Sequence, residues 1–296
     1  MIKANYSEED GKRIYITPLI DTPYNDEAWI SQVQYSVNSV ILTHGGDRTS
    51  VGLIGYAKDH TSYYLEMFPE WGSVNAEAWK SDDLVISATE IRDHIFSETG
   101  AQGHMDTFVE EHTTEATRDW IWNWVQKHQD TVDHIAEEFR YVERYKEAWS
   151  HAPYPPTFVT VDSIVMQGAS ILMVRRKTQP GKGLWALPGG FVGQQELLLD
   201  AAIRELREET GLKVPEPVLR GSLKNTFVID DPNRSSRGRT ITHVHVFKLK
   251  RARTLPKVKG ADDADKAKWF LLSDLDPSKI FEDHNGIIQK GVGAVR

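Results

Sequence analysis

The chain has 296 residues and is 40% hydrophobic, with 9 Trp, 10 Phe and 10 Tyr, which is ample for two domains with packed cores. A formal net charge of −8 and a pI near 5.8 argue against a general nucleic-acid surface, although residues 234–239 form a local basic stretch. The sequence has no apolar run long enough to cross a bilayer, no secretory pattern and no Cys, so we expect a cytoplasmic protein without disulfides or thiolate metal sites.

Strand and helix patterns alternate in the first part of the chain. Residues 13–18 indicate a short strand, residues 35–42 the end of a helix, and residues 49–54 a buried strand. Residues 84–98 indicate a strand end that turns into a helix. Because such alternation is typical of a parallel, doubly wound sheet, we predict an α/β domain over residues 1–112.

A helical linker is predicted over residues 113–150, where the pattern is almost wholly helical. Trp120 and Trp124 lie one turn apart, and at this spacing we expect them to pack in a core or between domains rather than stack on bases. The Pro-rich residues 152–156 end the helix, because proline removes an amide donor. A second domain is therefore predicted over residues 151–296.

The second domain has the element order of an α+β sandwich. Residues 158–167 and 170–176 predict a β-hairpin, which is followed by a loop and a helix. Further strands are predicted near 222–229, at 240–249 and at 264–272, and a final helix closes the chain.

The strongest chemical signal lies in the 23 residues 190–212. Nine positions there have a fixed spacing, namely Gly190, Glu196, Arg204-Glu205-Leu206, Glu208-Glu209 and Gly211-Leu212. Glu205, Glu208 and Glu209 stand at i, i+3 and i+4, so they fall within a sector of about 100° on one helix. Carboxylates are the ligands that Mg²⁺ and Mn²⁺ prefer. The pattern favours a metal-binding helix over the alternative of a solvated charged face.

This spacing resembles the Nudix box, the signature of hydrolases that cleave a diphosphate linked to another group with the help of Mg²⁺ or Mn²⁺. The metal-binding residues that the resemblance implies are Glu205, Glu208, Glu209 and Gly190. The catalytic residues that it implies are Glu208, Glu209, Arg204 and Asp263. Arg204 would orient the glutamates through ion pairs, or else form an ordinary surface pair with Glu208. In this family the general base often comes from a later loop, so Asp262, Asp263 and Glu209 compete, and we favour Asp263.

Residues outside the helix are expected to hold the substrate. The backbone of Gly189 and Gly190 is expected near the diphosphate. Arg237 and Arg239 are candidates to neutralise the second phosphate or the terminal ribose, because guanidinium groups suit such oxygens. Trp185 or Phe191 would stack on adenine. The alternative for Arg237 and Arg239 is that they are exposed loop charges. The alternative for Trp185 and Phe191 is that they pack in the core. His243 is expected to be a strand histidine that bonds to a neighbour, whereas His284 resembles a position of the family and its role is left open.

The resemblance extends over nearly the whole chain once the N-terminal part is included. GYAKDHTSYYLEMFPEW and ISATEIR look like the C-terminal half of nicotinamide-mononucleotide adenylyltransferases, and PYPPTFVTVDSIVMQGASILMVRR, ALPGGFV, RGRTITH, KGADDADKAKWF and FEDHNGII lie where bifunctional adenylyltransferase/ADP-ribose pyrophosphatases place them. The resemblance implies an incomplete Rossmann-like nucleotidyltransferase fold followed by a Nudix sandwich. The chain begins after the position of that family's Gly-x-Phe-x-Pro-x-His-x-Gly-His loop, so we expect a truncated adenylyltransferase domain.

Five residues of the N-terminal part match nucleotide-binding motifs of the adenylyltransferases. Ser87, Thr89 and Arg92 match the second phosphate-binding motif, which combines hydroxyls at a helix start with a cation one turn later. Helix capping by Ser87 or Thr89 is the alternative. Lys58 and Asp59 resemble the loop on the nicotinamide side.

The resemblance implies Mg²⁺- or Mn²⁺-dependent hydrolysis of ADP-ribose to AMP and ribose 5-phosphate, in NAD metabolism. One alternative is a bifunctional enzyme that also makes NAD from nicotinamide mononucleotide and ATP, if the missing N-terminal loop is supplied. Another is a non-catalytic regulator that binds ADP-ribose or NAD, which the complete set of glutamates disfavours. The expected partner is a small-molecule nucleotide, with no membrane and no nucleic acid. Other nucleoside diphosphate derivatives and a homo-oligomer stay open.

Overall fold

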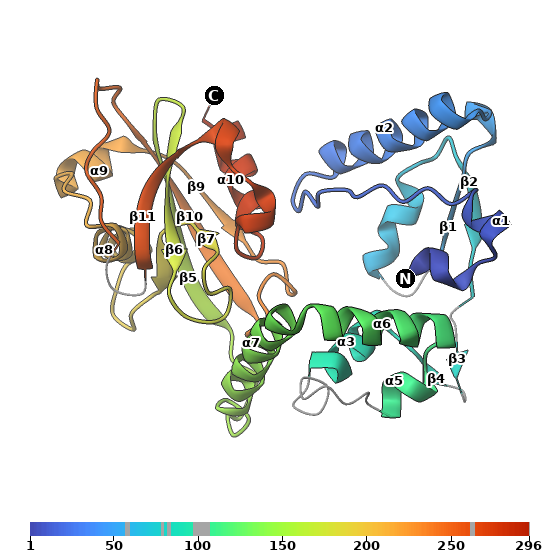
Figure 1. The fold of residues 1–296 in the computed structure, drawn as a ribbon. Coiled ribbons are helices and arrows are strands. Elements are labelled where there is room, and N and C mark those ends of the chain that lie inside the picture. Colours follow the sequence, from blue (N-terminus) through green and yellow to red (C-terminus); the bar gives the residue numbers. More distant parts are fainter. Residues whose placement is uncertain (57–59, 78–79, 82–83, 97–106, 261–263, 296) are drawn as a thin grey trace. The chain divides into compact units, whose positions relative to one another are not determined.

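The computed structural model of the chain describes residues 1–56, 60–77, 80–81, 84–96, 107–260 and 264–295. The chain divides into two compact units, Met1–Asp21 with Asp26–Arg140 and Thr22–Asn25 with Tyr141–Arg296 (Figure 1). The domain limits that the sequence predicts, at residues 112 and 150, stay predictions. In the described part of the chain, no helix has both the length and the apolar content that a membrane crossing needs.

The first unit combines helices with short strands, which confirms the α/β class. Its helices, with 3₁₀ helices written η, are η1 (Ile2–Asn5), α1 (Glu8–Gly11), α2 (Asp26–His44), η2 (Arg48–Ser50), η3 (His60–Glu66), α3 (Ala88–Phe96), α5 (Thr107–Glu111), α6 (Glu115–Lys127) and most of α7 (Gln129–Glu147). Its strands are β1 (Gly52–Gly55), β2 (Gly72–Asn75), β3 (Lys80–Ser81) and β4 (Leu84–Val85). Within the described residues, β1 and β2 form a parallel pair and β3 and β4 an antiparallel pair, so the doubly wound sheet that the pattern predicted is reduced to two strand pairs.

Two sequence predictions in this unit are wrong. Residues 13–18 form no strand, and Tyr15 there stacks on the ring of His44 with centroids 4.0 Å apart instead of facing a sheet. Residues 49–54 do not form a buried strand, because β1 begins at residue 52 and Ile54 is 69% exposed. An apolar run is buried in a sheet when a second layer covers it, and local pattern carries no information about that layer.

The helical part of the unit has its own apolar core. Val109, Ile121, Val125 and Val132 are buried together, and Trp124 packs against them. This packing is the one expected for Trp124 from its helical spacing. Thr114 begins α6 by accepting a hydrogen bond from the Thr117 amide at 3.2 Å, which satisfies one free donor of the first turn.

The second unit is a sheet covered by helices on both faces. Its strands are β5 (Phe158–Gln167), β6 (Ser170–Arg176), β7 (Trp185–Ala186), β8 (Gly189–Phe191), β9 (Leu223–Ile229), β10 (Thr240–Leu249) and β11 (Ala264–Leu271). Its helices are α8 (Leu198–Thr210), α9 (Glu216–Ser222), η4 (Leu272–Asp274), η5 (Pro277–Lys279) and α10 (His284–Gly293). The main strand order is β11-β6-β5-β10-β9, with β5 and β10 parallel, and β7 and β8 pair with β6 and β5.

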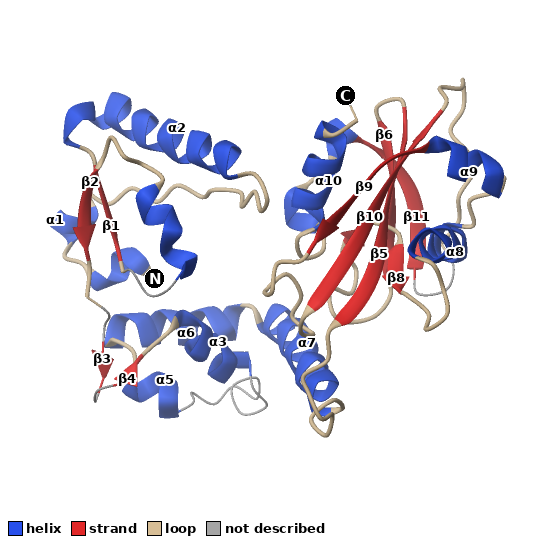
Figure 2. Cartoon of the chain, turned by 180° about the vertical axis from the view of Figure 1, so that it is seen from behind, coloured by secondary structure: helices blue, strands red, loops and turns tan. Residues whose placement is uncertain are grey.

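Alternation along β5 produces the two layers, because successive side chains point to opposite faces of a sheet. Ile164 and Met166 pack with Ile287 of α10, whereas Val165 packs with Leu206 of α8. Figure 2 shows α8 and α10 on opposite sides of the sheet. The predicted hairpin of β5 and β6 and the strand β10 are confirmed to the residue. Gly211 caps the C-terminal end of α8 with a φ of 59°, a left-handed conformation that glycine adopts readily.

Candidate active site

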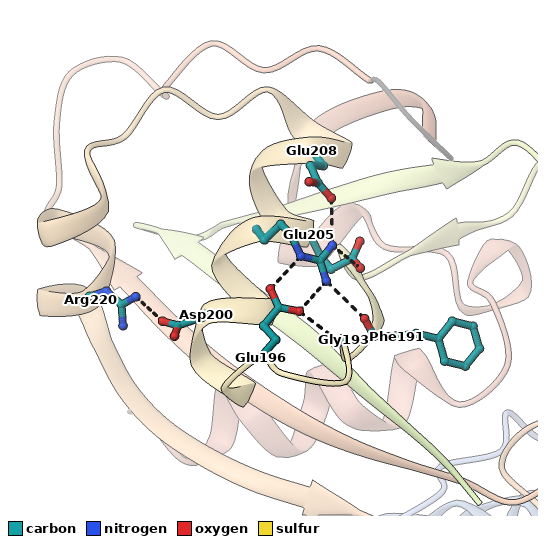
Figure 3. A network of polar contacts seen from close by, with 8 residues as sticks. Phe191, Gly193, Glu196, Asp200, Glu205, Glu208 and Arg220 are labelled. Carbon is teal, nitrogen blue, oxygen red and sulfur yellow. Dashed lines mark hydrogen bonds and ion pairs between the residues drawn. The ribbon is translucent and has the colours of Figure 1, made fainter. Parts of the chain in front are cut away.

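The helix α8 presents a group of charged side chains that centres on Arg204. Arg204 Nε and Nη2 donate to the two carboxylate oxygens of Glu196, both at 2.8 Å. Its Nη1 donates to Glu205 at 2.8 Å and to Glu208 at 2.9 Å. Figure 3 shows these three glutamates turned toward one guanidinium, with the carbonyl of Phe191 beside them. Arg204 thus fixes the orientation of the acidic side chains.

Two glycines of β8 let this strand approach its neighbours closely, α8 at Gly190 and β5 at Gly189. A Cβ on Gly190 would lie 2.6 Å from the carboxyl carbon of Glu205, so a side chain there would collide with the carboxylate. A Cβ on Gly189 would lie 2.1 Å from the carbonyl oxygen of Val161. The amide of Gly189 donates to Glu209 at 3.0 Å. Gly190 therefore leaves room for the Glu205 carboxylate, and Gly189 leaves room for the backbone of β5.

Glu209 differs from the other glutamates because its side chain is buried. The pKa of Glu209 is raised to about 8, chiefly by burial and also by the negative charges of Glu205 and Asp162, while the hydrogen bond from Gly189 and the charge of Arg176 oppose the rise. The Arg204 guanidinium, in contrast, is bonded to the more exposed carboxylates Glu196, Glu205 and Glu208.

This donor set fits a hard divalent cation, since such ions prefer carboxylate oxygens. In the part of the chain that the structure describes, no three His, Asp or Glu side chains converge as closely as coordination needs. The reason is that Arg204 holds Glu205 and Glu208, while Glu209 turns to β8. Nudix domains in general depend on a divalent metal ion.

A pocket of about 210 Å³ opens beside Glu209 and β8. Its polar walls come from six separate segments of the second unit. The polar and charged side chains that line it are Tyr141, Tyr145, Thr160, Asp162, Arg176, Thr178, Gln179, Glu209, Arg234, Arg237, Thr240, Glu282 and His284. The wall of the pocket therefore combines acidic groups, among them Glu209 of α8, with guanidinium groups.

The guanidinium groups of the pocket are suited to an anion. Arg176 stacks on the ring of Phe281 at 4.1 Å, and burial followed by repulsion from Arg237 lowers the pKa of its guanidinium. Arg237 Nε and Gln179 Nε2 are buried without a hydrogen-bond partner among the residues that the structure describes. Buried donors are normally paired, so these two atoms point to a missing acceptor in or beside the pocket.

Some of the residues that the sequence predicts to bind the substrate meet in this pocket. Gly189, Gly190, Phe191 and Arg237 all line it. Of the two candidate stacking rings, the structure brings Phe191 to the pocket, with Arg237 5.5 Å from its ring centre.

The structure places the other candidates elsewhere. Trp185 packs edge-on against Phe270 in the core beneath α10, with centroids 4.7 Å apart. Arg239 donates to the carbonyl of Asp230 and is absent from the pocket lining. Asp262, Asp263, Lys58 and Asp59 lie outside the described residues.

The structure shows the surroundings of the two histidines and of the predicted phosphate-binding motif in the first unit. His284 Nδ1 accepts the amide of Leu187 at 3.0 Å, which fixes the pocket wall. His243 is a half-buried residue of β10. Ser87 caps α3 by accepting the Glu90 amide at 3.2 Å, and Arg92 donates to Thr89 at 3.2 Å. Nucleotide binding by these three residues of the first unit stays a prediction.

Sequence reasoning missed several residues of the pocket. Asp162, Arg176, Gln179, Arg234 and Glu282 are far apart in the chain and meet through the sheet topology. One usable signal existed, since Asp162 is the single charged residue of the largely apolar strand β5. It is 6% exposed and accepts from Thr242 at 2.6 Å.

Comparison with known proteins identifies the class of the second unit, since a model described as NUDIX domain matches residues 156–290. The chain is 37% identical over 131 residues to an ADP-ribose pyrophosphatase of Methanocaldococcus jannaschii, which covers 44% of this chain and 70% of the relative. It is 46% identical over 93 residues to a nicotinamide/nicotinic acid mononucleotide adenylyltransferase of Acinetobacter baylyi, which covers 31% of this chain. This second match spans 45% of that relative, less than half of its length.

One solved structure matches the chain from end to end. The bifunctional NMN adenylyltransferase/ADP ribose pyrophosphatase from Francisella tularensis covers 100% of this chain and 82% of its own, with a TM-score of 0.83 and 32% identity. A structure from the same organism, complexed with AMP and Mn ion, covers 96% and 80%, with a TM-score of 0.81 and 32% identity. The chain belongs to this family of bifunctional adenylyltransferase/Nudix proteins.

Proposed function

We propose that this chain is a hydrolase that depends on Mg²⁺ or Mn²⁺ and cleaves the diphosphate of ADP-ribose to AMP and ribose 5-phosphate. The observation that carries the proposal is the position of Glu209, one of the α8 carboxylates, in the wall of a pocket that Arg176 and Arg237 also line. Acidic groups that suit a cation and guanidinium groups that suit a phosphate thus border the same space.

Glu205, Glu208 and Glu209 would hold the metal, with the backbone of Gly190 beside them. A divalent ion supplies neutralisation of the phosphate oxygens and a water of lowered pKa. Arg204 orients Glu205 and Glu208 through its Nη1, and it takes one oxygen of each carboxylate. The proposed base is Asp263, from the later loop.

The far side of the pocket would bind the rest of the substrate. Arg237 and Arg176 are suited to the second phosphate or the terminal ribose, because guanidinium groups bind such oxygens. The two guanidinium groups lie close enough to repel each other, so they can act on the same part of the substrate. Phe191 is 43% exposed at the rim and offers a ring face for adenine. The similarity to an ADP-ribose pyrophosphatase and to a bifunctional enzyme complexed with AMP and Mn ion supports this substrate class.

The alternative that the chain also makes NAD from nicotinamide mononucleotide and ATP stays a prediction. It is favoured by the adenylyltransferase relative.

Product analysis tests the proposal directly. Purified protein with Mg²⁺ or Mn²⁺ and ADP-ribose should release AMP and ribose 5-phosphate in equal amounts, because water adds across one phosphoanhydride bond. Excess EDTA should abolish the release, and restored metal should recover it, since the carboxylates act through the ion. Absence of AMP with either metal, or full activity in EDTA, would refute the proposal. If NADH or a dinucleoside polyphosphate were cleaved faster than ADP-ribose, that compound would be the preferred substrate.

A further inference from the structure

The four residues Thr22–Asn25 belong to the second unit although the chain before and after them belongs to the first. The segment forms a tight turn, because the amide of Asn25 donates to the carbonyl of Thr22 at 3.1 Å. Tyr24 adopts a positive φ of 71°, which is uncommon for a residue with a side chain. The turn lies directly against α10, where a Cβ on Gly286 would come within 2.5 Å of the Pro23 carbonyl oxygen. The segment is thus seated closely on the second unit.

Tyr24 donates its hydroxyl to a buried ion pair. Its Oη lies 2.5 Å from Asp283 Oδ2. Arg234 donates to both oxygens of the same carboxylate, from Nε at 2.8 Å and from Nη2 at 3.0 Å. The side chains of Arg234 and Asp283 are 4% and 8% exposed. Burial and the hydrogen bond to Asp283 raise the pKa of Tyr24, so the hydroxyl keeps its proton at neutral pH and acts as a donor.

This ion pair joins two walls of the pocket. Asp283 stands between Glu282 and His284, and both of these neighbours line the pocket, as does Arg234. Glu282 accepts the amide of Ser236 at 3.2 Å and has a positive φ of 41°. The residue after Ser236 is Arg237, whose buried Nε was identified above as a donor in need of an acceptor. Contacts therefore run from Tyr24 through Asp283 to the loop that carries Arg237.

A buried carboxylate needs several donors to hold one orientation, because each unsatisfied oxygen carries a desolvation penalty. Arg234 supplies two donors from the side of the loop, and Tyr24 supplies a third from the opposite segment. Loss of the Tyr24 hydroxyl would leave the backbone at Glu282, which is already strained, less restrained.

We infer that Tyr24 is a positioning residue for substrate binding, which holds Asp283 and thereby the Arg237 loop in the geometry that receives the far end of the substrate. The inference rests on the proposed function for its kinetic test, and it also has a test without substrate.

The kinetic test is Tyr24→Phe in the full chain. We expect KM for ADP-ribose to rise about fivefold to tenfold, with kcat changed by less than about twofold, because the lost hydrogen bond to a charged group acts on binding. The matched control is Tyr63→Phe, which removes a hydroxyl 3.3 Å from Asp26 within the first unit and should leave both constants unchanged. An unchanged KM in Tyr24→Phe, or an equal fall of kcat, would contradict the inference.

A double-mutant cycle separates positioning from a general structural effect. In the background Arg237→Ala, the further change Tyr24→Phe should raise KM by less than about twofold, because the group that Tyr24 positions is gone. Full additivity of the two changes would show that Tyr24 does not act through Arg237.

Hydrogen exchange without substrate distinguishes failure of this inference from failure of the proposed function. In Tyr24→Phe, the amides of Ser236 and Leu187 should exchange faster by roughly fivefold or more, since both donate to the wall that Asp283 anchors. The independent variant Gly286→Ala should push the Pro23 carbonyl away and give the same pattern. Unchanged exchange in both variants would overturn the inference even if ADP-ribose were cleaved, and faster exchange in a protein that left ADP-ribose intact would overturn the proposed substrate alone.

Discussion

Glu208→Gln should lower kcat for ADP-ribose hydrolysis by about a thousandfold or more, measured as AMP release with saturating Mg²⁺. The expected loss follows from removing one anionic metal ligand, because stabilisation by a bound ion contributes several kcal/mol at the transition state. The fold should be kept, since the Glu208 side chain is 45% exposed and the amide oxygen of Gln can still accept from Arg204 at the present 2.9 Å.

The matched control for this variant is Glu216→Gln. Glu216 has a similar exposure of 43% and also pairs with an arginine four residues away, Arg220, at 2.7 Å. It belongs to α9 and has no proposed part in metal binding, so its replacement should leave kcat within about twofold. Comparable losses in the two variants would mean that surface charge in general, rather than the α8 carboxylates, supports the reaction.

Gly190→Ala should reduce kcat by about a hundredfold while the protein still folds. The new Cβ would stand 2.6 Å from the Glu205 carboxyl carbon, which is the flexible end of a side chain and can move aside. Movement of a catalytic group by about 1 Å is enough for a loss of this size. Activity with Mn²⁺ and the thermal unfolding midpoint should be measured together, and the midpoint should stay close to that of the unchanged protein.

Alanine variants at two further glycines serve as controls for Gly190→Ala. Gly221→Ala meets nothing within 4 Å and should change neither activity nor stability by much. Gly189→Ala meets the Val161 carbonyl at 2.1 Å, and because backbone cannot move aside in the sheet, this variant should unfold more easily. Wild-type activity in Gly190→Ala would show that the position of Glu205 does not matter for the reaction.

The second unit could be predicted closely because its signals are local. Alternation specifies β5 and β6, and the apolar stripe of α8 with Gly211 at its end specifies the helix. The same local reasoning placed the three box glutamates on one sector. The ion pairs of Arg204 with Glu205 and Glu208 were expected, whereas the burial of Glu209 against Gly189 was not.

The pocket could be predicted only in part, because its walls depend on long-range pairing. Arg176 ends β6 and Glu282 precedes α10, and no spacing rule connects them. The choice of Phe191 over Trp185 depends on which side of the sheet each ring faces, which a short strand of 2 or 3 residues does not reveal. The role of Tyr24 depends on a turn that packs on residues about 260 positions later.

In the first unit, local pattern was least informative where strands are short. β1 has 4 residues and a half-exposed burial pattern, so its apolar sequence gave a misleading expectation of burial. Helices α6 and α7 are longer and carry a consistent apolar stripe, and they were anticipated correctly.

The central claim is that the carboxylates of α8 bind a divalent cation at the edge of the pocket. Anomalous scattering from Mn²⁺ in crystals of the full chain with AMP tests it most directly. We expect a peak at about 2.1 Å from carboxylate oxygens of at least two of Glu205, Glu208 and Glu209. A peak at another place, with the three side chains still bonded to Arg204 and Gly189, would contradict the claim.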